Sequence, residues 1–338
     1  MRAMLLTAPA ATGASGPLQL ANLPRPVPGP DEILIRVSVC GVCHTELDEI
    51  DGRTPPRKYP VVPGHEIVGR VEAAGADCRR HEIGQRVGVG WIYRSCGGEL
   101  ENIDEAFVAT GRDANGGYAE FVAVPEQYAY PIPDVFTDAE AAPLLCAGAV
   151  GYRSLRLAKL QDGQVLGLTG FGGSGHLVLQ LARHLYPHGQ VFVFARSAAE
   201  RAFAMELGAN WSGDTTDEPP VPAHAIIDTT PAWKPVLCAL QQLRPGGRLV
   251  INAIRKESFD RHLMAGIDYE QHLWMEKEIK SVANVTQADI EAFLPIAAEI
   301  PLRVEVQTYP LADANEALTD LRAGHVRGAK VLEIGAAP

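Results

Sequence analysis

A regular alternation of buried strands and helices, which begins near Val165, constrains the fold more than any other feature of the sequence. The strand at 165–168 meets Gly170, and apolar residues then recur at helical spacing up to Leu185. Strands of the same buried type, mostly with helices between them, follow at 190–194, 225–227, 248–251 and 279–283. Such alternation is typical of α/β proteins with a doubly wound parallel sheet. We therefore expect a domain of this class over residues 149–284.

The first 148 residues have a different pattern, in which short strands are separated by Gly and Pro turns. The strands are expected at 32–39, 67–72, 86–89 and 118–124. This spacing favours a mostly antiparallel, barrel-like first domain over residues 1–148. After a helix at 288–300, strand-like segments follow at 303–307 and 330–334, and we expect no crossover helix between those strands and the end of the chain. We interpret residues 285–338 as a return to the first domain.

The composition of the chain restricts the partners that it could bind. The 338 residues include 41 acidic and 30 basic side chains, a formal net charge of −11, which repels phosphate backbones and anionic lipid. No run approaches the roughly 18 apolar residues of a spanning helix. Residues 1–10 lack the pattern of a signal peptide. We therefore expect a cytoplasmic protein that binds a small-molecule substrate and neither nucleic acid nor a membrane.

The segment Gly170-Phe-Gly-Gly-Ser-Gly175 contains the pattern G-x-G-x-x-G. It follows a buried strand and opens an amphipathic helix, which is the context in which this pattern binds a dinucleotide. Gly170 permits the tight turn, Gly172 lets the backbone approach a pyrophosphate, and Gly175 permits close packing of helix and strand. The N–H groups at the helix N-terminus then bind the phosphates. The predicted cofactor-binding residues of this turn are Gly170, Gly172, Gly173, Ser174 and Gly175.

The end of the second strand of this domain indicates which dinucleotide is bound. A carboxylate there would bind the ribose hydroxyls of NAD, but Phe194 is followed by Ala, Arg196 and Ser197, with Arg201 one turn later. A guanidinium suits the 2′-phosphate of NADP. We therefore expect Arg196 and Ser197 to bind the cofactor and favour NADP(H), while NAD(H) is not excluded. The alternative is that the two arginines only solvate a surface loop.

Two thiols, an imidazole and a carboxylate form a second candidate site. Cys43, His65, Glu66 and Cys146 are of the ligand types that suit zinc, and a catalytic zinc takes about three protein ligands and one exchangeable position. The six cysteines of the chain lie at 40, 43, 78, 96, 146 and 238, without the even spacing of a disulfide framework. Spacing alone leaves both a metal site and buried core cysteines open.

Taken together, these segments resemble the zinc-dependent alcohol dehydrogenases of the medium-chain dehydrogenase/reductase superfamily, over essentially the whole chain. The resemblance implies that the first domain is a mostly-β, GroES-like catalytic domain and that the second is a Rossmann cofactor domain. It implies that Cys43, His65 and Cys146 bind a catalytic zinc and that Glu66 can enter or leave the coordination sphere. It also implies a homodimer or homotetramer.

The same resemblance assigns roles to residues around the zinc. Thr45 would exchange a proton with the substrate oxygen, and Glu46 would orient His65. Trp91 matches a position that lines the substrate pocket, where an indole would favour slim, short-chain or planar substrates. The alternative is that Trp91 only packs in the core. The other implied contacts are those of the cofactor pyrophosphate with His44 and Arg327.

The chain departs from the family pattern at two places. The family usually holds a second, structural zinc by four cysteines, but only Cys96 remains here, with Asp104 where the last cysteine would fall, so we expect no structural zinc. Asp48 stands where the family often has a histidine that relays protons. A carboxylate can hydrogen-bond the cofactor ribose but would need a raised pKa to relay protons near neutrality.

We therefore expect a zinc-dependent oxidoreductase that transfers hydride between a nicotinamide cofactor and a small alcohol, aldehyde or ketone. The altered residue at position 48 leaves one alternative within the superfamily, which is reduction of an activated C=C bond such as that of an enoyl-CoA thioester. A second alternative is a relative that binds the cofactor without catalysis.

Overall fold

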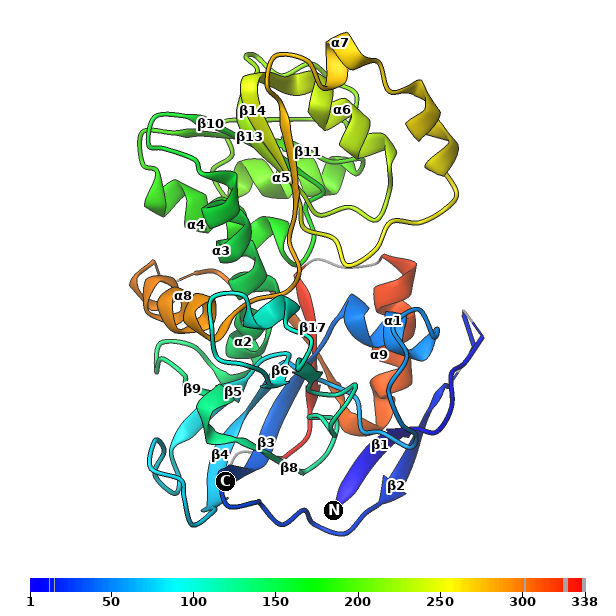
Figure 1. Ribbon diagram of the computed structural model, residues 1–338, viewed down its shortest axis with the longest axis vertical. Coiled ribbons are helices and arrows are strands. Elements are labelled where there is room, and N and C mark those ends of the chain that lie inside the picture. The colour runs from blue at the N-terminus through cyan, green and yellow to red at the C-terminus, as the bar shows by residue number, and fades with distance from the viewer. Residues whose placement is uncertain (12, 15, 301, 325–327, 336–338) are drawn as a thin grey trace. The chain divides into compact units, whose positions relative to one another are not determined.

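The computed structural model describes residues 1–11, 13–14, 16–300, 302–324 and 328–335 (Figure 1). The chain divides into two compact units. The first comprises Met1–Ala149, Asn284–Ala298 and Val304–Pro338, and the second comprises Val150–Ala283 and Glu299–Arg303. Arg327, which the sequence predicts as a pyrophosphate contact, lies outside the described residues. Within those residues, no helix is long and apolar enough to cross a membrane.

The first unit is built on a seven-stranded sheet with the order β16-β17-β3-β4-β5-β9, in which β8 also pairs with β3. Its strands are β3 (Glu32–Val42), β4 (Ile67–Ala74), β5 (Arg86–Val89), β8 (Phe121–Pro125), β9 (Ala129–Pro131), β16 (Val306–Pro310) and β17 (Ala329–Glu333). Two small sheets pair β1 (Arg2–Leu6) with β2 (Leu18–Asn22) and β6 (Ile92–Arg94) with β7 (Val108–Ala109). Its helical elements are α1 (His44–Ile50), α2 (Asp138–Ala141), α8 (Gln287–Glu299), α9 (Ala314–Ala323) and the short 3₁₀ turns η1 (Glu101–Ile103), η2 (Glu126–Tyr128), η3 (Ala142–Leu145) and η5 (Leu311–Asp313).

Strand β3 is the centre of this sheet. It pairs antiparallel with β4 along one edge, where Cys40 lies opposite Ile67, and with β8 and β17 along the other. Because antiparallel neighbours run in opposite directions, the residues that follow β3 lie beside the residues that precede β4. This register brings position 43 next to positions 65 and 66.

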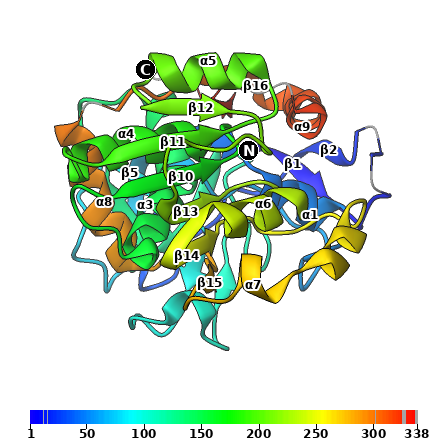
Figure 2. The ribbon, with the colours of Figure 1, turned by 90° about the horizontal axis from the view of Figure 1, so that it is seen from above.

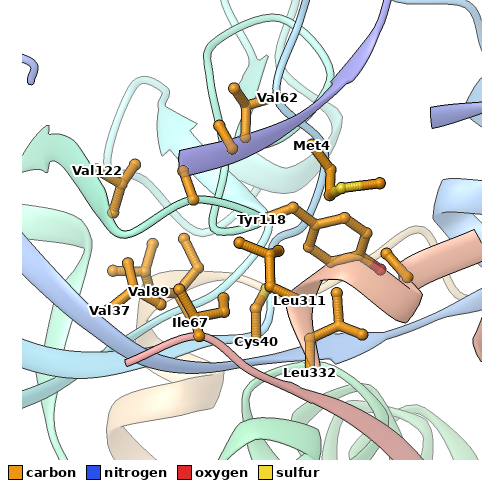
Figure 3. Close-up of a cluster of buried hydrophobic side chains, with 14 of the residues drawn as sticks. Met4, Val37, Cys40, Val62, Ile67, Val89, Tyr118, Val122, Leu311 and Leu332 are labelled. Atoms are coloured by element: carbon orange, nitrogen blue, oxygen red, sulfur yellow. The ribbon is translucent and has the colours of Figure 1, made fainter. Parts of the chain in front are cut away.

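Side chains from distant segments of the chain form the core of the first unit (Figure 3). Cys40 of β3, Ile67 of β4 and Leu332 of β17 meet Tyr118, and all four are fully buried. Burial raises the pKa of the Cys40 thiol well above its usual value, so this group stays neutral in the core.

The structure corrects the prediction for the end of the chain. The first returning strand is β16, which begins at Val306 rather than at Arg303, and α9 lies between it and β17 although no crossover helix was expected. The two strands pair in parallel, and parallel neighbours need a crossover connection. Helix α9 buries Leu318 and Leu321 and ends at Gly324, whose φ is +74°.

The second unit is a six-stranded parallel sheet in the order β12-β11-β10-β13-β14-β15 (Figure 2). Its strands are β10 (Val165–Thr169), β11 (Gln190–Phe194), β12 (Trp211–Gly213), β13 (Ala223–Asp228), β14 (Leu243–Ile251) and β15 (Glu278–Ser281). Its helical elements are α3 (Ala147–Ala158), which begins in the first unit, α4 (Gly175–Leu185), α5 (Ala198–Glu206), α6 (Lys234–Gln242), η4 (Arg261–Gly266) and α7 (Tyr269–His272). This is the doubly wound order of a Rossmann domain, so the predicted α/β fold class is confirmed.

Candidate metal centre and dinucleotide turn

Four side chains of the first unit form a cluster that could hold a metal ion. One ligand atom from each of Cys43, His65, Glu66 and Cys146 lies within 4.8 Å of all the others. Cys43 follows β3 directly and begins α1, the pair His65–Glu66 precedes β4, and Cys146 follows η3. No other such group occurs within the described ranges. The register of β3 and β4 therefore assembles three of the four candidate ligands.

His65 is oriented by a carboxylate behind it. Its Nδ1 lies 2.5 Å from Oε1 of Glu46, while Oε2 of Glu46 accepts a hydrogen bond of 2.8 Å from the backbone N–H of Cys43. With Nδ1–H directed at Glu46, the other ring nitrogen, Nε2, faces the cluster; it is buried and makes no hydrogen bond within the part of the chain described. An orphaned buried imidazole nitrogen beside two thiols fits a zinc ion.

The charges of the cluster also suit a cation. Burial alone would lower the pKa of His65. The negative charges of Glu46 and Cys43 outweigh this effect, so that the pKa lies well above its usual value. The Sγ atoms of Cys43 and Cys146 lie 3.9 Å apart, and a hydrogen bond from Cys146 lowers the pKa of Cys43 well below its usual value. Thiolates are the ligand form that zinc takes.

Glu66 reaches the cluster because residue 41 has no side chain. Burial raises the pKa of this carboxyl well above its usual value, with Cys43 adding to the effect. A Cβ atom placed on Gly41 would lie 1.8 Å from Oε2 of Glu66, far inside van der Waals contact. Sequence reasoning assigned no role to Gly41, although it stands in the same short segment as Cys43.

Thr45 and Asp48 lie on the first turns of α1. Thr45 is buried, and its Oγ1 is 3.6 Å from Sγ of Cys43. Asp48 is also buried and accepts hydrogen bonds from Arg53, whose guanidinium is partly exposed and also contacts Asp51 at 2.9 Å. His44, the first residue of the helix, is exposed. Sequence reasoning missed Arg53, which holds the carboxylate of Asp48 in an ion pair.

Trp91 forms one wall beside the ligand cluster. Its ring centroid lies 6.2 Å from that of His65 and 5.3 Å from that of Phe107, which meets it edge-on. The guanidinium of Arg112 lies 5.2 Å from the centroid of the indole. Trp91 is therefore held by contacts on more than one side rather than free to rotate.

The segment around Cys96 is anchored by a carboxylate. Cys96 is exposed and stands outside the ligand cluster. Glu101, five residues later, is buried. Its carboxylate accepts hydrogen bonds from the hydroxyl of Tyr128 at 3.0 Å and from the backbone N–H of Gln287 at 2.5 Å. Its backbone carbonyl oxygen accepts a hydrogen bond from the hydroxyl of Ser95. Sequence reasoning missed Glu101, because Tyr128 and Gln287 lie 27 and 186 residues away in the sequence.

The glycine turn of the second unit has the geometry of a dinucleotide cradle. Gly170 has φ of +80°, and a Cβ there would lie 2.8 Å from Oγ1 of Thr229. A Cβ at Gly172 would meet nothing within 4 Å, whereas one at Gly175 would lie 2.8 Å from the carbonyl oxygen of Gly170. There is thus free space at Gly172, where a pyrophosphate would approach the backbone. There is no space for a side chain at Gly175, where the helix packs against the strand. Gly173 and Ser174 complete the turn, and α4 begins at Gly175.

The end of β11 carries no acidic side chain. Ser197 is the N-cap of α5, where its Oγ accepts hydrogen bonds from the N–H groups of Ala199 and Glu200. The guanidinium of Arg201 donates to the carbonyl oxygens of residues 195 and 196 and so stabilises the turn between β11 and α5. Arg196 is exposed. Its guanidinium is the one that could reach a ligand at this strand end.

Comparison with known proteins shows that the chain is similar to dehydrogenases. Residues 29–134 match the family model described as the alcohol dehydrogenase GroES-like domain. The "Probable alcohol dehydrogenase AdhA" of Mycobacterium tuberculosis (strain CDC 1551 / Oshkosh) is 41% identical over 334 residues, which cover 95% of this chain and 94% of that protein. The "Probable cinnamyl alcohol dehydrogenase 8A" of Oryza sativa subsp. japonica is 32% identical over 345 residues, with 96% and 94% covered.

Solved structures agree with this result. The cinnamyl alcohol dehydrogenase SbCAD4 of Sorghum bicolor superposes with a TM-score of 0.86 at 26% identity, covering 99% of this chain and 98% of that one. A Rossmann-type unit and a unit with a candidate metal cluster are the parts expected of a dinucleotide-dependent oxidoreductase. The chain belongs to the zinc-type alcohol dehydrogenase family of the medium-chain superfamily, and the family implies a zinc ion and a nicotinamide cofactor. The predicted family and enzyme class are confirmed, and the C=C reductase alternative is not favoured.

Proposed function

We propose that this enzyme transfers hydride between a nicotinamide dinucleotide and the oxygen-bearing carbon of a small alcohol, aldehyde or ketone. The observation that carries the proposal is the cluster of Cys43, His65, Glu66 and Cys146, with one imidazole nitrogen buried and unbonded. Zinc bound there would supply a Lewis acid, and the nicotinamide would supply or accept the hydride. The relatives named as alcohol dehydrogenases support the same substrate class.

The roles of the residues around the cluster are part of the proposal. We assign to Thr45 the exchange of a proton with the substrate oxygen, because its hydroxyl is buried within 3.6 Å of a ligand sulfur. Glu46 fixes His65 and the backbone of Cys43. Asp48 accepts a hydrogen bond from the cofactor ribose, and the ion pair with Arg53 makes it an anchor rather than a proton carrier. Glu66 would be the ligand of the zinc that can exchange, because its carboxylate lies in the same cluster as the two thiols and the imidazole.

The contacts with the cofactor and the substrate complete the assignment. The glycine turn from Gly170 to Gly175 binds the pyrophosphate, with further contacts from His44 and Arg327. Trp91, held by Phe107 and Arg112, limits the width of the substrate. In these roles the first unit corresponds to a catalytic domain of residues 1–148 and 285–338, and the second to a cofactor domain of residues 149–284.

We also propose NADP(H) as the preferred cofactor and one zinc per chain. The exposed guanidinium of Arg196 and the lack of a carboxylate after β11 favour the 2′-phosphate, and the hydroxyl of Ser197 can still donate to it while it caps α5. The lone, exposed Cys96 supports the absence of a structural zinc, since one thiol cannot close a tetrahedral site.

A substrate panel tests the reaction. Short aldehydes, ketones, primary and secondary alcohols, and short enoyl-CoA esters are assayed with NADPH and NADH or their oxidised forms. We expect carbonyl reduction to dominate, because every group needed at the substrate oxygen is present. Rapid enoyl-CoA reduction with negligible aldehyde turnover would overturn the proposal. NADH bound ten-fold more tightly than NADPH, about 1.4 kcal/mol in the wrong direction, would overturn the cofactor assignment.

Replacement of Thr45 tests the proton step. Thr45→Ala should lower kcat by roughly 10²–10⁴, the range for lost general acid–base catalysis, with a smaller change in the dissociation constant of the dinucleotide. Thr319→Ala is the matched control, because Thr319 is an exposed threonine on α9. A Thr45→Ala enzyme with wild-type kcat would remove Thr45 from the mechanism.

A further inference from the structure

A buried ion pair lies beside the glycine turn, and nothing in the reaction proposed above uses it. Asp228, the last residue of β13, is fully buried. The ammonium of Lys256, from the segment after β14, donates to its Oδ2, and the lysine side chain is only 9% exposed. A buried charge pair is stable only when its remaining hydrogen-bonding groups are also satisfied.

The carboxylate of Asp228 joins the two central strands. Its Oδ1 accepts hydrogen bonds from the hydroxyl of Thr169 at 2.5 Å and from the hydroxyl of Thr230 at 2.8 Å. Thr169 ends β10 and immediately precedes Gly170. In this sheet, β11 and β12 follow β10 on one side, and β13 to β15 lie on its other side (Figure 2). The strand order therefore reverses between β10 and β13, and ligands of such sheets bind at the ends of the two strands that flank this reversal.

The ammonium of Lys256 has no donor left for a ligand. Besides Asp228, it donates to the carbonyl oxygens of Thr230 at 2.7 Å and of Ala232 at 3.1 Å. An ammonium has three donors, and all three are used. The lysine therefore acts on the backbone of residues 230–232 rather than on a phosphate.

The neighbouring backbone at residues 229 and 230 packs directly against the glycine turn. The N–H and the hydroxyl of Thr229 both donate to the carbonyl oxygen of Thr169, each at 3.0 Å. A Cβ on Gly170 would lie 2.8 Å from Thr229 and 2.9 Å from Thr230. The position of Gly170 is thus set by the segment that the ion pair holds.

We propose that Asp228 and Lys256 are positioning residues for the dinucleotide: as a buried, net-neutral pair they lock the ends of β10 and β13 and so hold the Gly170 turn in the shape that receives a pyrophosphate. The proposal rests on dinucleotide binding by this unit. It predicts that the affinity for the dinucleotide depends on the neutrality of the pair. A buried carboxylate without its lysine would distort the turn and repel the phosphates.

A double-mutant cycle tests this proposal. NADPH binding to the full-length enzyme is measured by titration of the cofactor fluorescence for the wild type, Lys256→Met, Asp228→Asn and the double variant. Lys256→Met should raise the dissociation constant by about ten-fold or more, because Asp228 is left unpaired. The double variant should bind within about three-fold of the wild type, because the amide that replaces the carboxylate is neutral and its oxygen still accepts from both threonines. Its KM for NADPH should recover in parallel, with kcat at saturating cofactor little changed in all variants.

Lys234→Met is the control for loss of one positive charge, because Lys234 is exposed and lies near the same loop. It should leave the dissociation constant unchanged. A double variant that binds NADPH as weakly as Lys256→Met would mean that binding depends on Lys256 itself and not on the balance of charge. A Lys256→Met variant with wild-type affinity would mean that the pair has no role in binding. Either result overturns the proposal. If the wild type binds neither NADPH nor NADH, the proposed function itself fails.

Discussion

At the scale of single residues, Glu46 orients two of the candidate metal ligands, His65 and Cys43. One of its oxygens holds the ring of His65 and the other holds the backbone N–H of Cys43, so a single carboxylate fixes the direction of two ligands. Such an outer partner restricts the imidazole to one tautomer and one orientation. The cost is burial of a carboxyl, which raises the pKa of Glu46, although His65 opposes the rise.

Replacement of Glu46 should therefore weaken zinc binding without removing a ligand. In Glu46→Gln, the single amide oxygen cannot accept from both His65 and Cys43. The apparent zinc affinity, measured by competition with a chromophoric chelator, should fall by about 10–100-fold. Glu316→Gln, at an exposed position on α9, should have no effect. Elemental analysis of the wild type should give one zinc per chain, and two would contradict the proposal that the structural site is absent.

The candidate residues differ in how far the sequence could identify them. Cys43, His65 and Cys146 have side chains of a recognisable ligand type, so residue chemistry and family resemblance were enough to propose them. Gly41 and Glu101 matter because of what packs against them, and no local pattern marks such contacts. The same holds for Lys256, whose partner is a strand end that only the folded sheet brings near.

At the scale of secondary-structure elements, local periodicity predicted most of the second unit and failed at the end of the first. The strands 190–194 and 248–251 lie within the observed strands because buried runs between helices carry their own signal. The segment 303–307 has strand-like residues, but its pairing with β17 starts only at Val306. Tertiary pairing therefore decides where β16 begins. Helix α9 was missed, although its buried positions 314, 317, 318 and 321 follow helical spacing.

Helices α1 and α9 are joined by a buried carboxylate at the end of α1. Both oxygens of Asp51 accept hydrogen bonds of 2.8 Å from Arg322, and Arg53 adds a contact of 2.9 Å. Burial would raise the pKa of Asp51, but the two arginines lower it below its usual value. The two helices therefore depend on an ionised aspartate.

This arrangement predicts a loss of stability in acid. The pKa of Asp51 is lower in the folded than in the unfolded chain, so its contribution is fully present above the unfolded value of about 3.9 and is lost as the pH falls through the folded value. Asp51→Asn should lower the free energy of unfolding at pH 7 by about 1.5–3 kcal/mol, the range for hydrogen bonds to charged groups. The difference from the wild type should shrink below about pH 4 in urea titrations. Asp134→Asn, at an exposed aspartate, should show neither effect. A difference independent of pH would contradict this assignment.

At the scale of the whole molecule, the second unit ends in an unprotected sheet edge. Strand β15 pairs only with β14 among the described strands, and all four of its residues are exposed. Shortly before it in the chain come Tyr269, Trp274 and Met275, each at least half exposed, which line a hollow of about 690 Å³. We call β15 and these three residues the edge patch. An exposed edge with apolar neighbours is a template for pairing with another chain.

We expect the edge patch to be covered by a second copy of this chain, paired with it edge to edge. Each copy carries a formal charge of −11, so two copies repel each other, and in a dimer the apolar patch would have to supply the attraction. We therefore expect the wild type to sediment at a multiple of the 36.3 kDa chain mass, as a homodimer or a homotetramer. Trp274→Glu places a charge in the patch and should shift the enzyme towards the monomer in sedimentation velocity, most strongly at low salt, where like charges are screened least. Val27→Glu is the matched control, because Val27 is an apolar side chain that is 87% exposed in the first unit. A monomeric wild type, or a Val27→Glu enzyme that dissociates as readily as Trp274→Glu, would show that the edge patch does not hold the copies together.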